Sequence, residues 1–585
     1  MNVRHRTMKT GIAAIAVCLL AACSGGGVSH GVPATPVTSP TAGSLAPMTT
    51  SRFTITVPSA NTTTSSSRAP KFVSPNTASV IITLTTVGTT PFTGTATSPA
   101  SIATNLTTAN TAACATVGGA LTCTASAPAV AGNDTYSIVT YDTGQSSPTP
   151  AGHVLSQATL TIPVTAGQAN PVTTPLVLTG VVNSIVVTPA NASDPHILGT
   201  QATGYSIVGN QPYTFNITGK DASGATIVGS AAQGAPAFTC TSATPGSVVV
   251  TTANANACTL QVKSVNVSSA TQALVPVALT VTPSQGSAAT VNITTVQELW
   301  VTNGGITANN GSVTAYYSIP GANQSTQIPT DTIPGLTEPT ALAVDASGNL
   351  WVATFSASAV SSITAYVPGT STPFNTISGA SSGLDEPFGL AFDAAGHLWV
   401  ASLSGNGSGG AGSGAITAYN VGPTPPTIFA NDTITGGGLS GPVGLAFQPV
   451  SGSLWVANEG VGNGDITVST PGTNAANSSI TAGTSAPFDL AFEASSGNLW
   501  VVNFAGGSGL GSVTEYAPGS NTVIATITTG LDEPEGLAFD ASGNLWVANV
   551  TSGTVTEYAA ASKALIATIP TTANLNNPGG LAFTP

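Results

Sequence analysis

Six copies of the apolar triplet Leu-Trp-Val dominate the pattern of hydrophobic and polar positions in the second half of the chain. They contain every tryptophan of the sequence and follow one another about 45–55 residues apart. A short apolar run bounded by turn residues is typical of a buried strand. A repeat of this length predicts one structural unit used six times, as in a solenoid or a propeller. The six tryptophans are Trp300, Trp351, Trp399, Trp455, Trp500 and Trp546.

Each repeat predicts four antiparallel strands, which together make one blade. In the last full repeat, a proline and the apolar strand Gly536–Phe539 come first. The turn Asp540–Asn544 then leads to Leu-Trp-Val, because Asp hydrogen-bonds turn backbone and Gly tolerates positive φ. A third strand follows at 554–558, and 521–527 is an example of a fourth strand.

The two ends of the repeat region predict that the blades close into a ring. The first copy begins at Leu299 with the second strand of a blade, whereas the last copy ends at Phe583 with only a first strand. Pairing the two half-repeats completes one blade and removes the free sheet edges. An open solenoid would leave both halves unpaired, so we expect a six-bladed β-propeller over residues 296–585.

The blade motif resembles a known family of repeats. Pro-x-Gly-Leu-Ala-Phe-Asp-x-x-Gly-Asn-Leu-Trp-Val-Ala-Asn, as found at Pro534–Asn549, is similar to the NHL-type repeat. It also looks like the six-bladed propellers of the gluconolactonase and virginiamycin B lyase families. The resemblance implies the propeller fold, but both enzymes and binding platforms use it. Lyase activity would imply a catalytic His at the channel, and His397, the only His in the repeats, occupies a turn position instead.

The first half of the chain predicts two further β-modules, at 50–180 and 181–295. Both contain runs of alternating β-branched residues between clusters of Gly, Pro, Asn and Asp, which is the pattern of antiparallel sheets. Each block has the size of one β-sandwich. The segment Lys220–Ile227 resembles a hairpin of bacterial immunoglobulin-like surface domains. The predicted fold class is therefore all-β, with two sandwiches and a propeller.

The N-terminus predicts export and a lipid anchor. Positive charges at Arg4, Arg6 and Lys9 precede an apolar run at 11–20 that is too short to span a bilayer. The sequence Leu-Ala-Ala-Cys23 resembles a lipobox, which implies a signal peptide at 1–22 and lipidation of Cys23; a plain signal peptide is the alternative. The Gly, Ser, Pro and Thr of 23–49 predict a flexible tether to a bacterial membrane.

The remaining cysteines agree with an oxidising compartment. They form two close pairs inside β-rich stretches, which favours two local disulfides. Metal binding is the alternative, but no His lies near either pair and the spacings are not Cys-x-x-Cys. The two pairs are Cys114 with Cys123, and Cys240 with Cys258.

Charge excludes a nucleic-acid surface on the propeller. The formal net charge is −13, and from residue 297 onward Lys563 is the only basic residue among eighteen carboxylates. Phosphate binding needs clustered Lys and Arg, so we expect no nucleic-acid partner.

Polar residues at one face of the propeller form the predicted site. Loops before the first strands and the ends of the Trp strands meet around the channel mouth, where carboxylate and amide oxygens would suit Ca²⁺ or a polar ligand. The alternative is that these residues form turns and cap strand ends, as Asn and Asp often do. The candidates are Glu338, Glu386, Glu533, Glu535, Asn303, Asn458, Asn503 and Asn549.

Three functions remain open on these residues. The first is an envelope lipoprotein that presents the propeller as a binding platform for an unknown polar ligand or protein. The second is a calcium-dependent hydrolase or lactonase at the channel mouth, which the gluconolactonase resemblance implies. The third is a structural or adhesive surface protein. No phosphate loop, nucleophile elbow or Cys/His dyad is visible.

Overall fold

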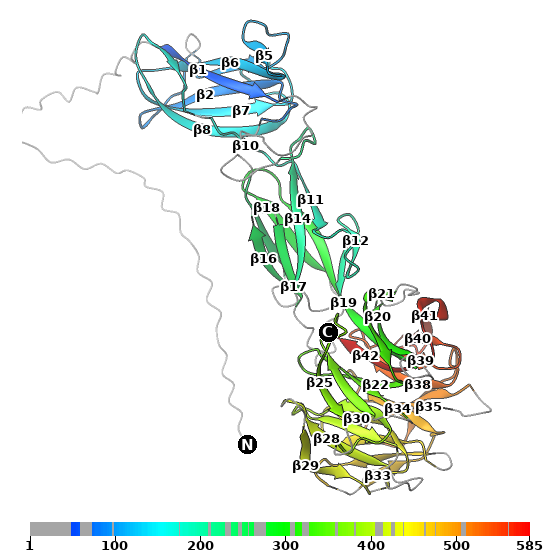
Figure 1. The fold of residues 1–585 in the computed structure, drawn as a ribbon. Helices are drawn as coiled ribbons and strands as arrows, with labels where there is room; N and C mark the ends of the chain where they lie inside the picture. The colour runs from blue at the N-terminus through cyan, green and yellow to red at the C-terminus, as the bar shows by residue number, and fades with distance from the viewer. Residues whose placement is uncertain are drawn as a thin grey trace, which may run out of the picture.

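The computed structural model describes residues 48–584 with internal gaps, and Figure 1 shows three β-rich bodies in a row. The signal peptide, Cys23 and nearly all of the tether lie outside the described residues. No helix in the described part of the chain is long and apolar enough to cross a membrane. The internal gaps are 59–72, 96–98, 175, 209–211, 228–235, 244–247, 255–256, 263–275, 305–309, 319–326, 357–360, 379–381, 404–413, 423–426, 437, 461–463, 474–475, 505–509 and 560.

The first module consists of two sheets around one core. In β1 (Thr49–Val57) every second side chain is buried, so Phe53, Ile55 and Val57 face inward. One sheet has the order β5 (Cys114–Val117), β6 (Ala120–Ala129), β1, β9 (Ala169–Pro171). The other has the order β10 (Thr179–Gly180), β8 (Val154–Val164), β7 (Gly132–Tyr141), β2 (Ser79–Val87), β3 (Thr90–Pro91), with β4 (Ser101–Asn105) also on β2.

The second module also has two sheets around a separate core. One sheet has the order β11 (Ser184–Pro189), β14 (Pro212–Lys220), β17 (Ala257–Val262), β16 (Val248–Asn254). The other has the order β12 (Ile197–Thr200), β13 (Gly204–Val208), β19 (Ala289–Asn303), β18 (Val277–Pro283), β15 (Phe238–Ser242). Disulfides join Cys114 to Cys123 and Cys240 to Cys258, so the predicted pairing is confirmed.

Strand β19 belongs to two bodies at once. Its first part pairs with β13 and β18 of the second module, up to Val296. From Gln297 onward it pairs with strands of the propeller. A continuous strand therefore connects the second module directly to the first blade (Figure 1).

The propeller has six four-stranded antiparallel blades, as the repeat predicts. In chain order, the five uninterrupted blades are β22 (Pro339–Val344) to β25 (Pro373–Ser378), with β23 (Leu350–Thr354) and β24 (Ser362–Tyr366); β26 (Pro387–Phe392), β27 (Leu398–Ser402), β28 (Ala415–Asn420), β29 (Thr427–Ile434); β30 (Pro442–Phe447), β31 (Leu454–Asn458), β32 (Asp465–Ser469), β33 (Ala476–Ile480); β34 (Pro487–Phe492), β35 (Leu499–Asn503), β36 (Ser512–Tyr516), β37 (Val523–Ile527); and β38 (Pro534–Phe539), β39 (Leu545–Asn549), β40 (Thr554–Tyr558), β41 (Leu565–Ile569).

The sixth blade combines both ends of the repeat region, which confirms ring closure. It consists of β42 (Pro578–Thr584), β19, β20 (Gly311–Ser318) and β21 (Gln327–Leu336), and a short 3-10 helix, η3 (Thr571–Ala573), precedes β42. Leu299 pairs with Phe583, as expected. The first strands of the six blades contact one another in a closed circle: β22, β26, β30, β34, β38, β42 and again β22.

The tryptophans pack between blades. Five of the six indoles contact the phenylalanine that ends the first strand of the following blade, in an edge-to-face arrangement. Trp546, for example, lies 6.0 Å from Phe583, measured between ring centroids. The other pairs are Trp351–Phe392, Trp399–Phe447, Trp455–Phe492 and Trp500–Phe539. Trp300 instead packs in a core with partly buried Val344, the corresponding residue of the next blade.

Candidate functional site at the channel mouth

Three of the predicted glutamates occupy a strained turn. Glu338, Glu386 and Glu533 precede the proline of their blades and have φ of 39°, 50° and 50°. Their carbonyls accept hydrogen bonds from the residue that follows the second strand of the same blade, for example from the Leu403 N–H to the Glu386 carbonyl at 3.0 Å. The same position in the other blades also has positive φ: Gly441, Ala486 and Asn577. This turn explains the position of these three residues without a ligand.

The predicted asparagines lie inside the blades. Asn303, Asn458, Asn503 and Asn549 are all buried. The Asn458 side-chain amide donates to Thr467 Oγ1 at 3.1 Å and accepts from the Ser440 N–H at 3.2 Å. The other three make the same kind of bonds to their third strand and to the preceding loop. These amides hold the loops of the channel mouth in place, because each amide oxygen accepts a backbone N–H of its loop.

A pocket of about 160 Å³ lies at the mouth of the channel. Two of the predicted residues, Glu338 and Glu535, line it. Half of its wall comes from the residue that directly follows the proline of a first strand, in five of the six blades. The lining is Gly304, Glu338, Pro339, Thr340, Phe388, Phe488, Glu535, Val550, Asn577 and Gly579.

One side of this pocket is aromatic. The rings of Phe388 and Phe488 meet edge to face with centroids 6.2 Å apart. Phe355 packs on Phe388, and Phe504 packs on Phe488. Sequence analysis missed this wall because it considered only polar candidates. The signal is present in the sequence, since the residue after the proline varies between blades while the proline and the Leu-Ala pair that begins three residues after that proline are the same in all six.

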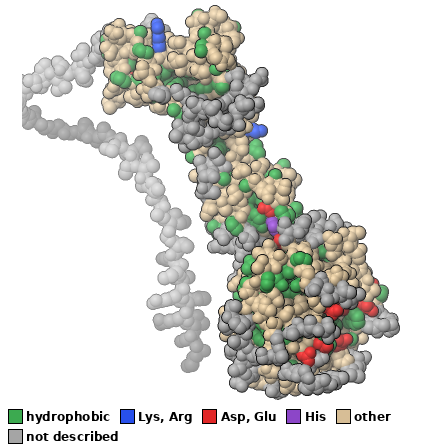
Figure 2. Space-filling model, in the orientation of Figure 1, with side chains coloured by type: hydrophobic (Ala, Val, Ile, Leu, Met, Phe, Trp, Pro, Cys, Tyr) green, Lys and Arg blue, Asp and Glu red, His purple; other side chains and the backbone are tan. Residues whose placement is uncertain are grey.

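The same pocket also has an acidic side chain, Glu535. Burial raises the pKa of the Glu535 carboxyl to about 7, and the nearby Glu459 and Glu533 carboxyls add to the rise. Deeper on the same ring of first strands, burial also raises the pKa of Asp489 to about 7. Asp489 accepts the N–H of Leu537 in the next blade at 3.0 Å, so it joins two blades. Acidic side chains gather on the propeller face seen in Figure 2.

The calcium site stays a prediction. In the part of the chain that the structure describes, only one group of three His, Cys, Asp or Glu side chains is close enough to share a metal ion, and it lies away from the channel mouth. The turn residues Asp345, Asp393 and Asp540 accept the indole N–H of their blade's tryptophan, so their recurrence is structural. His397 contacts Asp393 in the same outer turn, at 2.9 Å.

Comparisons with known proteins give no family. No protein-family model matches the chain. No curated protein matches it either. Solved structures match about half of it. A nidogen/laminin complex is 18% identical over 49% of this chain and 98% of that chain, with a TM-score of 0.36. A "putative 6-phosphogluconolactonase" from Bacteroides fragilis NCTC 9343 is 14% identical over 50% of this chain and 98% of that chain (TM-score 0.36), and a protein of unknown function from Bacteroides caccae is 12% identical over 49% of this chain and 99% of that chain (TM-score 0.37). These likenesses say nothing about activity.

Proposed function

We propose that this protein is an exported, lipid-anchored binding protein whose propeller holds a polar group of a ligand at the channel mouth. The observation that carries the proposal is the mixed lining of this pocket, which combines the Phe388 and Phe488 rings with the Glu535 carboxyl. A wall of aromatic edges and faces contacts apolar C–H surface, while a carboxylate accepts hydrogen bonds.

The pocket size narrows the ligand class. A volume of about 160 Å³ is below the roughly 300–1,000 Å³ of sites that enclose a whole drug-sized molecule. It therefore fits one terminal ring of a larger ligand. A sugar ring has both an apolar face and hydroxyl donors, so a terminal sugar of an envelope glycan is the ligand class we favour.

A lactonase of the gluconolactonase type is the second candidate. It is supported by the resemblance of the blade motif and by Glu535, whose pKa of about 7 suits a general base at neutral pH. An assay of δ-lactone hydrolysis distinguishes the two proposals. If the wild type hydrolyses the lactone and Glu535→Gln does not, the protein is an enzyme rather than a binding protein.

Replacing Glu535 with Gln is expected to weaken sugar binding by about 10- to 100-fold at pH 8, because one charge-assisted hydrogen bond is lost. The wild-type affinity should rise with pH through about 7, as the carboxyl ionises, and the variant should show no such rise. Calorimetric titration with a panel of neutral and amino monosaccharides, at pH 5.5 and 8, measures both effects.

Thermal unfolding provides a control that needs no ligand. The folded-state pKa of Glu535 lies above the ordinary 4.5, so its contribution to stability is complete below pH 4.5 and is lost as the pH rises through about 7. Glu535→Gln should therefore reduce the loss of stability over this range. Glu493→Gln, in an outer turn, is the matched control. If the wild type binds no monosaccharide and hydrolyses no sugar lactone, a structural or adhesive surface protein becomes the better explanation.

Anchoring is tested separately. With Cys23→Ala, the chain is expected to lose lipidation and to move from the membrane pellet to the soluble fraction, since the acyl chains would be its attachment. Globomycin should block processing of the wild type. Cys18→Ala, within the apolar run of the signal, is the matched cysteine control and should still be lipidated. Membrane association that persists in Cys23→Ala would contradict the anchor.

A further inference from the structure

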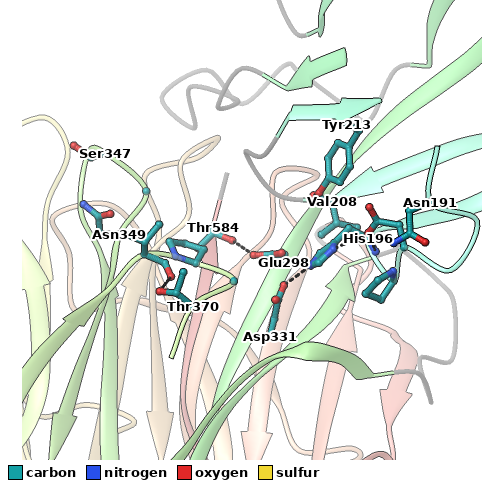
Figure 3. A pocket seen from close by; sticks show the side chains of 16 residues that line it. Asn191, His196, Val208, Tyr213, Glu298, Asp331, Ser347, Asn349, Thr370 and Thr584 are labelled. Atoms are coloured by element: carbon teal, nitrogen blue, oxygen red, sulfur yellow. Dashed lines mark hydrogen bonds and ion pairs between the residues drawn. The ribbon is translucent and has the colours of Figure 1, made fainter. Parts of the chain in front are cut away.

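A second polar cluster lies where the second module meets the propeller. Figure 3 shows His196, from the loop before β12, pointing at Asp331 on β21 and toward Glu298 on β19. The side chains border a pocket of about 520 Å³ whose walls come from both bodies. The cluster thus combines residues 135 positions apart in the sequence.

The His196 ring lies between two carboxylates. Its Nε2 is 2.8 Å from Asp331 Oδ2, and its Nδ1 is 2.9 Å from Asp194 Oδ1. One ligand atom from each of His196, Glu298 and Asp331 lies within 4.8 Å of the other two. Few side-chain movements would be needed for these three atoms to surround one ion.

Two hydrogen bonds fix the Glu298 carboxyl. Its Oε2 accepts from Trp300 Nε1 at 3.2 Å and from Thr584 Oγ1 at 3.0 Å. In three other blades a turn aspartate accepts the indole N–H. This blade is built from both ends of the repeat region, and Glu298 has that role here. The fixed carboxyl lies beside the His196 ring and the Asp331 carboxyl (Figure 3).

Asp331 is the observation that points to a missing ligand. Its side chain is 2% exposed, and its Oδ1 is buried with no hydrogen-bond partner. Oδ1 is directed toward Gly369, which lines the same pocket. A buried carboxylate oxygen without a partner is costly, so such atoms generally have a donor or an ion beside them.

The charge balance favours a cation. Asp194, Glu298 and Asp331 surround a single imidazole, and Lys563 is the only Lys or Arg of the entire propeller. Lys563 is engaged elsewhere, 3.2 Å from Glu515. Buried carboxylates are stable when a positive charge compensates them.

We propose that His196, Glu298 and Asp331 bind a first-row divalent metal ion, with Zn²⁺ preferred over Ca²⁺ and Mg²⁺. The imidazole nitrogen selects against the hard cations, which take oxygen ligands, whereas Zn²⁺ accepts both imidazole nitrogen and carboxylate oxygen. Three protein ligands leave a position for water or a small ligand from the adjoining pocket.

Asp194 has the position of an orienting residue for this metal. It accepts the Nδ1 proton of His196, which directs Nε2 toward the ion, as carboxylate–histidine–zinc arrangements do. Because His196 comes from the second module and the two carboxylates come from the propeller, the metal would fasten the two bodies together at the side of β19.

The test is titration of the metal-free full chain, purified in detergent after EDTA treatment, with ZnCl₂, CaCl₂ and MgCl₂. We expect one Zn²⁺ per chain and much weaker Ca²⁺ and Mg²⁺ binding. His196→Ala and Asp331→Asn should each weaken Zn²⁺ binding by more than about 100-fold, and Asp194→Asn by about 10- to 100-fold. Since Asp331→Asn preserves shape, it covers the case in which His196→Ala fails to fold.

His397→Ala is the matched control. His397 also has a ring nitrogen 2.9 Å from an aspartate, but no third ligand stands within reach in the described residues. This variant should bind Zn²⁺ like the wild type. Co²⁺ loaded in place of Zn²⁺ should give an absorption band that His196→Ala lacks. Absence of Zn²⁺ binding, binding unchanged in both ligand variants, or preference for Ca²⁺ would overturn the proposal and leave a plain His–Asp ion pair.

Discussion

Replacing Asp540 with Ala is expected to lower the free energy of unfolding by about 3 kcal/mol. The side chain is 5% exposed and accepts the N–H groups of Ser542 and Asn544, both at 2.9 Å, together with Trp546 Nε1 at 3.1 Å. Hydrogen bonds to an acidic group contribute about 1.5–3 kcal/mol each, and removal leaves a buried indole donor unpaired. Denaturant unfolding followed by tryptophan fluorescence measures the change.

The fold itself supplies a matched control at another blade. Gln448 occupies the corresponding turn position in front of Trp455, whose buried indole N–H has no partner in the described structure. Gln448→Ala should therefore change stability by no more than about 0.5 kcal/mol. Equal losses in Asp540→Ala and Gln448→Ala would contradict the view that the indole hydrogen bond fixes the turn.

The difference between these turns could not be predicted from the repeat alone. The backbone bond of the turn runs from the Asp540 N–H to the Asn544 carbonyl, but from the Gln448 N–H to the Ser453 carbonyl. One extra residue moves the acceptor out of reach of the indole. Glu493 begins a turn of this longer kind, and the indole N–H of Trp500 also has no hydrogen-bond partner in the described structure.

The sequence predicts on which face of the propeller the candidate site lies, but not which side chains line it. Repeat spacing put the proline loops and strand ends on one face, and Pro339 pairing with Thr354 agrees. It did not reveal that Asn458 and its counterparts are buried, because burial depends on the third strand and the preceding loop. The cluster of His196 and Asp331 was out of reach of any local pattern, since it forms only when two bodies meet.

Ring closure was predictable because it rests on counting strands, which needs no side-chain detail. The pairing of Leu299 with Phe583 follows from the half-repeats at the two ends. Closure also places β42 at the junction of the two ends of the repeat region. It pairs with β19, and it contacts the neighbouring first strands β22 and β38.

Removal of residues 578–585 is therefore expected to abolish cooperative folding of the propeller. Loss of β42 removes the buried Leu581 side chain and the contact of Phe583 with Trp546, and burial of such side chains stabilises by about 1.5–3 kcal/mol each. It also unpairs one edge of β19, whose ladder bonds contribute about 1 kcal/mol apiece. The sum approaches the roughly 5–15 kcal/mol total stability of a typical domain.

Near-ultraviolet circular dichroism reports this loss, since all six tryptophans lie in the propeller. The two N-terminal modules have their own cores, so the far-ultraviolet β signal should fall only in part. Leu565→Ala, on the exposed edge strand β41, is the control and should keep the native spectrum. A peptide of residues 578–585 added in excess should restore the tryptophan signal, whereas a scrambled peptide should not, because only the native register pairs with β19. A truncated chain with the wild-type spectrum and unfolding midpoint would show that the ring holds without its closing strand.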